Sequence, residues 1–228
     1  VNRKEDANWK VTVDLFASET GQALAETITS LKDDLSQEIQ DLVRENVKRR
    51  IFDPFYSSPV PYGHWEHGKS NWNAVCAGSV GSASIYLMKD EPDKDACLKR
   101  ICDALQYFLG SFADDGACME GLGYFTYGMT YFVGFAQQLF AYTGGKVDLL
   151  AQEKCAKMAE FQQKCYFASG RTLSFSDGNS RDHFRMGLTA YLAMRFPNVT
   201  VPNMERAGGF HRDSCYRFMG IYRDIVWT

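Results

Sequence analysis

The sequence predicts an all-α fold, an incomplete α/α toroid of antiparallel helical hairpins. Apolar residues recur at helical spacing from one end of the chain to the other, and only six prolines interrupt its 228 residues. Helices rich in small or aromatic residues alternate with amphipathic helices, which indicates an inner and an outer layer. A chain of this length can bury one substantial core, so we expect residues 1–228 to form a single domain.

The first predicted hairpin lies near the start of the chain. Ser18 is the expected cap of its first helix, because apolar residues follow at positions i, i+4 and i+7 of a helical pattern. Ser36 precedes the second helix, and Pro54 lies beyond the expected end of that helix. We expect the two helices to pack on each other.

The helices that follow alternate in composition. Those near 71–88 and 124–142 consist largely of small or aromatic residues, and we expect both to lie inside the molecule. Helices near 93–112 and 147–168 are amphipathic and belong to the outer layer. A last clear inner helix is expected near 180–195. Trp, Tyr, His, Asn, Asp and Gly concentrate in the segments before the inner helices, so we expect functional groups to gather at one rim.

Charge, hydropathy and cysteine spacing narrow the classes of function. A net charge of −3 offers no basic face for phosphates, so we expect no nucleic-acid partner. The chain has no apolar stretch long enough for a bilayer, and we expect no membrane partner. Seven cysteines without a CxxC pattern indicate mostly free thiols and no metal site. The compartment stays open: cytoplasmic, or periplasmic or secreted if an upstream signal has been removed.

The segment before the first inner helix, residues 62–73, contains two Trp, two His, two Asn, one Glu and one Lys. Indole faces stack on sugar rings, while Asn, His and Lys hydrogen-bond hydroxyls and carboxylates. Two interpretations stay open, because an Asn here also caps a helix and a Trp also fills a core. The candidate substrate-binding residues of this segment are His64, Trp65, His67, Trp72 and Asn73.

Candidate residues also occur before the other two inner helices. Tyr124, Tyr127 and Tyr131 stand at i, i+3 and i+7, which places their hydroxyls along one stripe of a helix. Glycines around Glu120 allow a ligand to approach the helix start, although a carboxylate there also serves as a cap through the helix dipole. Asp177, in the turn before the last predicted helix, is a further candidate substrate-binding residue beside Glu120.

Two of these segments together resemble a known family. The phrase SNWNAVCAGSVGSA, followed about fifty residues later by DDGACMEGLGYFTYGMTYF, is similar to the helical toroid domain of the heparinase II/III-like family of polysaccharide lyases. The similarity extends over most of residues 15–195. It implies β-elimination of uronate-containing polysaccharide, an acidic polysaccharide or oligosaccharide as partner, and no cofactor. It also implies a fragment of a longer protein, because the family's C-terminal β-sandwich domain is not in these 228 residues.

The resemblance implies roles for particular residues. The Asn that contacts the substrate carboxylate falls on Asn71, or on Asn73, and the Tyr that exchanges protons falls on Tyr124 or Tyr127. The sandwich of that family contributes a further His, and His183 is the candidate for it here. Donors whose hydrogen bonds strengthen as the dianionic intermediate forms lower the barrier by about 3 kcal/mol each. A tyrosine base needs positive neighbours, for which the candidates are Lys69, His64 and His67.

Two other functions remain open from the sequence. One is a glycoside hydrolase on a similar toroid, with Glu120 as acid and Asp115 or Asp177 as base. Inverting hydrolysis needs two carboxyl groups about 6.5–9.5 Å apart, so that separation would identify it. The other is a noncatalytic carbohydrate-binding or structural toroid, which would bind oligosaccharide without forming product.

Overall fold

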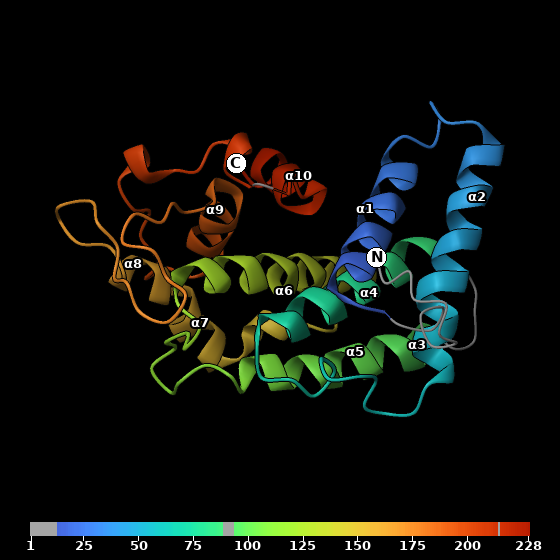
Figure 1. Cartoon of the computed structure of the whole chain (residues 1–228), viewed down its shortest axis with the longest axis horizontal. Helices are drawn as coiled ribbons and strands as arrows, with labels where there is room; N and C mark the ends of the chain where they lie inside the picture. Colours follow the sequence, from blue (N-terminus) through green and yellow to red (C-terminus); the bar gives the residue numbers. More distant parts are fainter. Residues whose placement is uncertain (1–12, 89–93, 214) are drawn as a thin grey trace.

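The computed structural model describes residues 13–88, 94–213 and 215–228, and in these residues the chain is all-α without a β-strand. Figure 1 shows the central helices running through the middle of the molecule, with the first three helices at one end. The helices are α1 (Leu15–Ser30), α2 (Gln37–Val47), α3 (Asp53–Ser57), α4 (Asn71–Leu87), α5 (Lys94–Leu109), α6 (Leu122–Tyr142), α7 (Glu153–Ala159), α8 (Phe161–Lys164), α9 (Met186–Arg195) and α10 (Phe218–Val226).

The two helices α4 and α6 form the centre of the fold. Every residue from 73 to 84 in α4 is buried, which confirms that this small-residue helix lies inside. Its glycines allow α6 to come close, since a Cβ added at Gly78 would lie 2.8 Å from the carbonyl oxygen of Tyr131. The helices α1 and α5 pack on the same central helix, α4. The amphipathic helix α5 buries one face, as the sequence predicts.

The first hairpin begins one turn earlier than expected. Asp14, not Ser18, caps α1, because the carboxylate of Asp14 accepts a hydrogen bond from the N–H of Ala17 at 2.8 Å. Ser18 lies inside the helix, and its hydroxyl donates to the carbonyl of Leu15. A carboxylate and a hydroxyl both serve as caps, so composition alone did not distinguish the two positions. Ser36 caps α2 as predicted.

Pro54 does not mark the end of a helix. The chain continues from α2 through one π-helical turn, residues 48–52, directly into α3. Pro54 lies in the first turn of α3, directly after the π-helical turn.

The predicted helix over 147–168 is broken into a 3₁₀ turn at Leu149–Ala151 and the short helices α7 and α8. The break at Glu160 turns the chain so that Phe161 packs against Phe125 of α6, with ring centroids 5.2 Å apart. The amphipathic pattern was therefore a correct indication of burial but not of one continuous helix.

The predicted helix over 180–195 begins only at Met186. Phe184 is extended and pairs with a distant segment instead: its N–H donates to Arg206, and its carbonyl accepts from Gly208. A residue held in this way cannot make helical hydrogen bonds.

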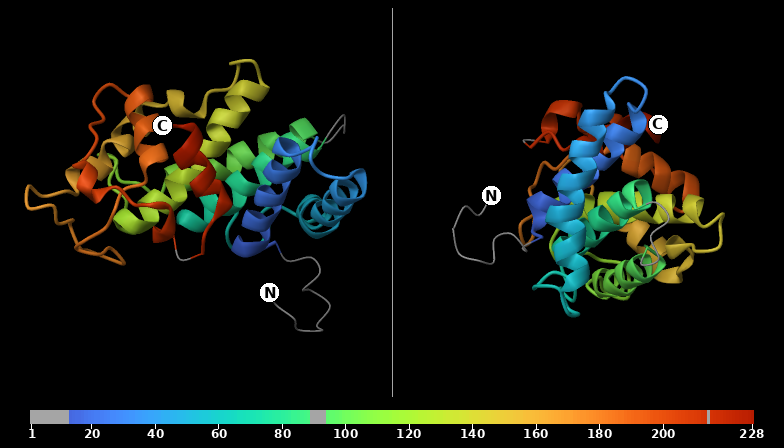
Figure 2. Two further views of the ribbon diagram at one scale, coloured as in Figure 1. Left: turned by 90° about the horizontal axis from the view of Figure 1, so that it is seen from above. Right: turned by 90° about the vertical axis from the view of Figure 1, so that its right-hand side faces the viewer.

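Helix α10 was not predicted, and it closes the fold. Phe218, Ile221 and Ile225 repeat at helical spacing, but the buried positions of the helix include Arg223 and Asp224. Arg223 donates two hydrogen bonds of 2.7 and 2.6 Å to Glu26 of α1, a residue 197 positions earlier. Figure 2 shows α10 between α9 and α1, the helices that it contacts.

Candidate functional site

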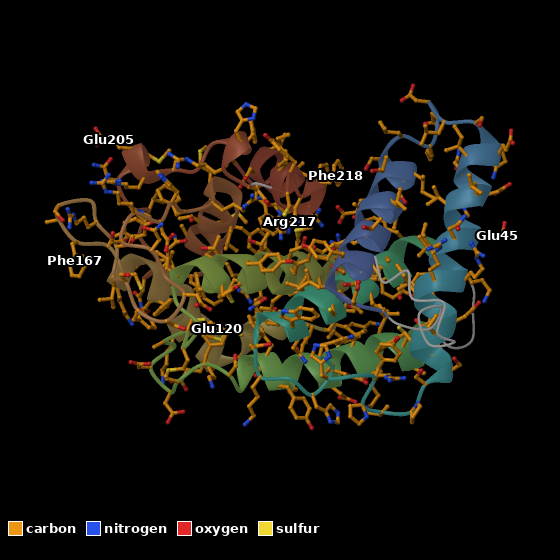
Figure 3. All side chains as sticks on the ribbon, viewed as in Figure 1. Glu45, Glu120, Phe167, Glu205, Arg217 and Phe218 are labelled. Atoms are coloured by element: carbon orange, nitrogen blue, oxygen red, sulfur yellow. The ribbon has the colours of Figure 1, made fainter. Side chains whose placement is uncertain are left out.

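A cavity of about 440 Å³ lies between the first half of α6 and the segments that pack on it from the last third of the chain. Figure 3 shows Arg217, one of its wall residues, above α6 in that view. Arginines, aspartates, tyrosines and a histidine line this cavity, which we call the α6 cavity. Its charged and titratable wall residues are Tyr124, Tyr127, Tyr131, Asp177, His183, Arg185, Arg212, Asp213, Arg217 and Asp224.

The tyrosine stripe predicted on α6 forms one wall of the α6 cavity. Tyr127 and Tyr131 both donate hydrogen bonds to Oε1 of Glu19, at 2.7 and 2.6 Å. Burial, and then the negative charge of Glu19, raise the pKa of both phenols well above the usual value. The two hydroxyls therefore keep their protons at neutral pH. Tyr124 is 39% exposed, and its hydroxyl has no hydrogen-bond partner among the described residues.

The opposite wall carries a network of arginines and aspartates. Arg217 contacts Asp213 at 2.7 Å, and Arg185 lies 3.8 Å from Asp213 and 3.3 Å from Asp224. Burial raises the pKa of Asp224, while Arg185 and the N–H of Gly187 oppose this shift. A side chain at Gly220 would collide with the Arg185 guanidinium, so this glycine leaves room for the network.

Two basic wall residues are less committed to internal partners. Arg212 is exposed and forms no ion pair within the described part of the chain. His183 is half-buried, and its Nδ1 lies 3.2 Å from the carbonyl oxygen of Arg206. A carbonyl only accepts hydrogen bonds, so Nδ1 carries the proton and Nε2 of the neutral ring keeps a lone pair. The α6 cavity thus combines a cation, a base and a phenol.

Asn71 does not line the α6 cavity. Its backbone N–H and its side-chain Nδ2 both donate to the carboxylate of Glu120, at 2.7 and 2.8 Å. Glu120 is therefore a cap, as one interpretation of it held, but of α4 rather than of the helix that follows it. Asn71 Oδ1 is buried without a hydrogen-bond partner in the described residues. Asn71 packs next to Gly128 of α6, beside the tyrosine stripe.

Asn73 and Trp65 are buried in the interior. The Nδ2 of Asn73 donates to three carbonyl oxygens, those of Trp65, Glu66 and Ala104, and so fixes the preceding loop to α5. Trp65 is 1% exposed, stacks on Phe55 and donates its indole N–H to Val13. Trp65 thus fills the core, the alternative that the sequence left open for it. Asn73 is buried as well, but it does not act as the cap that the sequence left open for an Asn here, since its Nδ2 donates to carbonyl oxygens instead.

The remaining aromatic candidates lie in ring pairs near the start of α4. The rings of His64 and Trp72 are 5.1 Å apart, and His67 stacks on Tyr107 at 4.3 Å. Neither pair lines the α6 cavity, and Lys69 does not line it either. The positive charge beside the tyrosines comes from arginines of the last third of the chain instead.

The carboxylates proposed for hydrolysis are not brought together in the α6 cavity. Asp177 lines it, whereas Glu120 and Asp115 do not. Asp115 accepts a hydrogen bond from the N–H of Ala117 at 3.0 Å and so stabilises a turn. Of the candidates taken from the sequence, five share the cavity: Tyr124, Tyr127, Tyr131, Asp177 and His183.

Several wall residues, and Glu19 behind the wall, were missed by sequence reasoning. Arg212 and Arg217 lie outside the motifs, in segments without a distinctive local pattern. The one available signal was the high content of basic residues between 181 and 223, which a search for a carboxylate-binding surface would have noted.

In the described residues, no cluster of three or more His, Cys, Asp or Glu side chains has the geometry of a metal site. No described helix is long and apolar enough to cross a membrane.

Comparison of the chain with models of known protein families gives no match, and a search of curated proteins gives no significant match either.

Proposed function

We propose that this protein binds a uronate-containing polysaccharide in the α6 cavity and cleaves it by β-elimination. The observation that carries the proposal is the combination, in one cavity, of Tyr124, a phenol without a hydrogen-bond partner in the described residues, with His183 and Arg212. The resemblance of the two sequence motifs to polysaccharide lyases supports the same chemistry. We also propose that the hairpins around α4 and α6 belong to an incomplete α/α toroid.

Three wall residues have a role in this reaction. Arg212 holds the uronate carboxylate, which neutralises the charge that builds up when the proton on the neighbouring ring carbon is removed. Nε2 of His183 accepts that proton. Tyr124 donates a proton to the glycosidic oxygen as its bond to carbon breaks and the ring double bond forms. Arg212 takes the carboxylate contact expected of Asn71, because Asn71 does not line the α6 cavity and is hydrogen-bonded to Glu120.

The test uses the full chain with alginate, heparin, hyaluronan and pectate, and measures the ultraviolet absorbance of the unsaturated product. Tyr124→Phe should lower the rate by about 10²–10⁴-fold, the usual contribution of a general acid. Tyr142→Phe is the matched control, because Tyr142 lies at the far end of α6 and outside the cavity. Its rate should match the wild type.

The other functions are distinguishable in the same experiment. New reducing ends without absorbance would identify a hydrolase, and binding without either product would identify a noncatalytic carbohydrate-binding domain. Absence of both binding and product for all four polymers would contradict the proposal.

A further inference from the structure

Glu19 of α1 is a point where three parts of the chain converge. Its Oε1 accepts hydrogen bonds from the hydroxyls of Tyr127 and Tyr131 on α6, and from Nε of Arg217 at 2.9 Å. The side chain of Glu19 is only 10% exposed. A buried carboxylate requires such partners, because the unpaired charge would be strongly destabilising. One oxygen atom therefore fixes α1, α6 and the segment before α10.

Tyr127, Tyr131 and Arg217 all line the α6 cavity, and Arg217 is the charged one of the three. Its guanidinium lies over the ring of Tyr127, 4.6 Å from the centroid, and Nη1 also binds Asp213. Arg217 and Tyr131 line the α6 cavity and also a second cavity of about 370 Å³ between α1 and the start of α10. The position of Arg217 therefore determines the boundary between two neighbouring cavities.

Glu19 itself does not line the α6 cavity. It acts on the cavity through its three hydrogen-bond donors, and two of these are phenols whose protons are committed to it. Tyr124, one helical turn before Tyr127, is left as the tyrosine of the stripe whose hydroxyl makes no hydrogen bond within the described residues. The arrangement separates two tyrosines that shape the wall from one that can exchange a proton.

We infer that Glu19 is a positioning residue: its carboxylate oxygen holds Tyr127, Tyr131 and Arg217 in the wall of the α6 cavity without contacting the ligand. The inference rests on the proposed function for the identity of the ligand, an acidic oligosaccharide. It does not rest on that function for the claim that Glu19 orders Arg217, so the two claims can fail separately.

The experiment compares the wild-type chain with Glu19→Ala, Glu19→Gln and the control Glu45→Ala. Glu45 is an exposed carboxylate on α2, at the end of the molecule away from the α6 cavity (Figure 3). One readout is the rate of trypsin cleavage after Arg217, and the other is the dissociation constant for alginate and heparin oligosaccharides by calorimetry. Circular dichroism checks that each variant is folded.

Trypsin should cleave the Glu19→Ala variant after Arg217 about tenfold faster than the wild type, and the variant should bind oligosaccharide about tenfold more weakly. Both effects follow from the loss of the hydrogen bonds that the Glu19 carboxylate accepts. Glu19→Gln keeps an oxygen acceptor in the same place, so both readouts should stay within about threefold of the wild type. Glu45→Ala should not differ from the wild type.

A folded Glu19→Ala variant with the wild-type cleavage rate would overturn the inference. A Glu19→Gln variant as impaired as Glu19→Ala would also overturn it, since charge rather than position would then be decisive. If Glu19→Ala does not fold, Glu19→Asp replaces it: this variant keeps the charge but is too short to reach, so its cleavage should also be faster. A wild type that binds no oligosaccharide contradicts the proposed function, while proteolysis still decides the role of Glu19.

Discussion

Buried charges in this protein occur in specific pairs, and Glu66 with Arg100 is one of them. The side chain of Glu66 is 1% exposed, and its two carboxylate oxygens accept from Nε and Nη2 of Arg100 at 2.6 and 2.8 Å. Arg100 also donates to the carbonyl oxygens of Phe55 and Ser58. A single residue of α5 thereby holds the loop that precedes α4.

Loss of Arg100 should strongly destabilise the fold. Arg100→Met leaves the buried carboxylate of Glu66 without a counter-charge, and we expect the free energy of unfolding to fall by about 3–5 kcal/mol. Lys99→Met, at the preceding position of α5, removes an exposed ion pair with Asp103 and should change stability far less than Arg100→Met. Urea denaturation measures both values, and equal losses would contradict this account.

For single residues, the sequence predicts the position of a side chain where that position depends on neighbours in the same helix. The spacing of Tyr124, Tyr127 and Tyr131 predicts one stripe on a helix, and that stripe lines the cavity. It does not predict Glu19 as the partner of two of these tyrosines, because the pairing joins residues 108 and 112 positions apart. Likewise, the indole of Trp65 is equally suited to a sugar and to a core, and only packing decides between them.

The contact between α4 and α6 shows why one helix of this fold is rich in small residues. At Gly78 the backbone of α6 is so near that a methyl group would meet the carbonyl oxygen of Tyr131 rather than a side chain that could move. The carbonyl belongs to the helix that carries the tyrosine stripe, so the small residues of α4 also set the position of the candidate site.

Gly78→Ala should destabilise the protein, although alanine normally favours a helix over glycine. We expect a loss of about 1–3 kcal/mol from overpacking, measured by thermal and urea unfolding. Gly123→Ala in the first turn of α6 is the matched control, because nothing lies within 4 Å of the added Cβ there. That variant should be neutral or more stable by up to about 1 kcal/mol. A stabilised Gly78→Ala variant would show that the two helices can separate at little cost.

Periodicity predicted the long helices well and the later ones poorly. The bounds of α4, α5 and α6 lie within a few residues of the expected ranges, because each has a continuous apolar or small-residue pattern. Helix α9 begins late because Phe184 pairs with a distant segment, which no local pattern records. Helix α10 has charged residues on its buried side, so its burial depends on partners that only the folded chain supplies.

Several buried thiols make the stability of the whole molecule depend on pH in the alkaline range. Burial raises the pKa of Cys76 and Cys155 from the ordinary value of 9.0 to about 12, and that of Cys118 and Cys165 to about 11. The folded state therefore retains these protons when the unfolded state has lost them. A thiol whose pKa is raised by folding contributes its full stabilisation below the pKa of the unfolded state, and that contribution is lost as the pH rises. The free energy of unfolding should therefore decline above about pH 9.

Between about pH 9 and 11, each of these thiols should lower the free energy of unfolding by roughly 1.4 kcal/mol per pH unit. Urea midpoints measured at several pH values give the slope. Cys155→Ala should be less stable at neutral pH, through lost packing, but should show a shallower slope. Cys215→Ala, at an exposed position, should keep the wild-type slope. A wild-type stability that stays flat up to pH 11 would contradict the prediction.

For the whole molecule, composition and periodicity were sufficient for the all-α class but not for the arrangement of the helices. The class follows from local hydrogen bonding and hydrophobic patterning along each segment. The arrangement depends on contacts such as Arg185 with Asp224 and Arg223 with Glu26, in which charged groups come together over long separations in sequence. The cavity is built by those contacts, so it was only partly predictable.

The pairing of Arg223 with Glu26 has a consequence for biosynthesis. At about 5–20 residues per second, a ribosome needs roughly 10–40 seconds to add the 197 residues that separate the two partners. Throughout that interval, the nascent polypeptide holds an acidic group intended for the interior with no cation to neutralise it. We expect the Glu26 end of helix α1 to stay hydrated during that interval, and a chaperone that shields it should raise the yield of native product in cell-free translation.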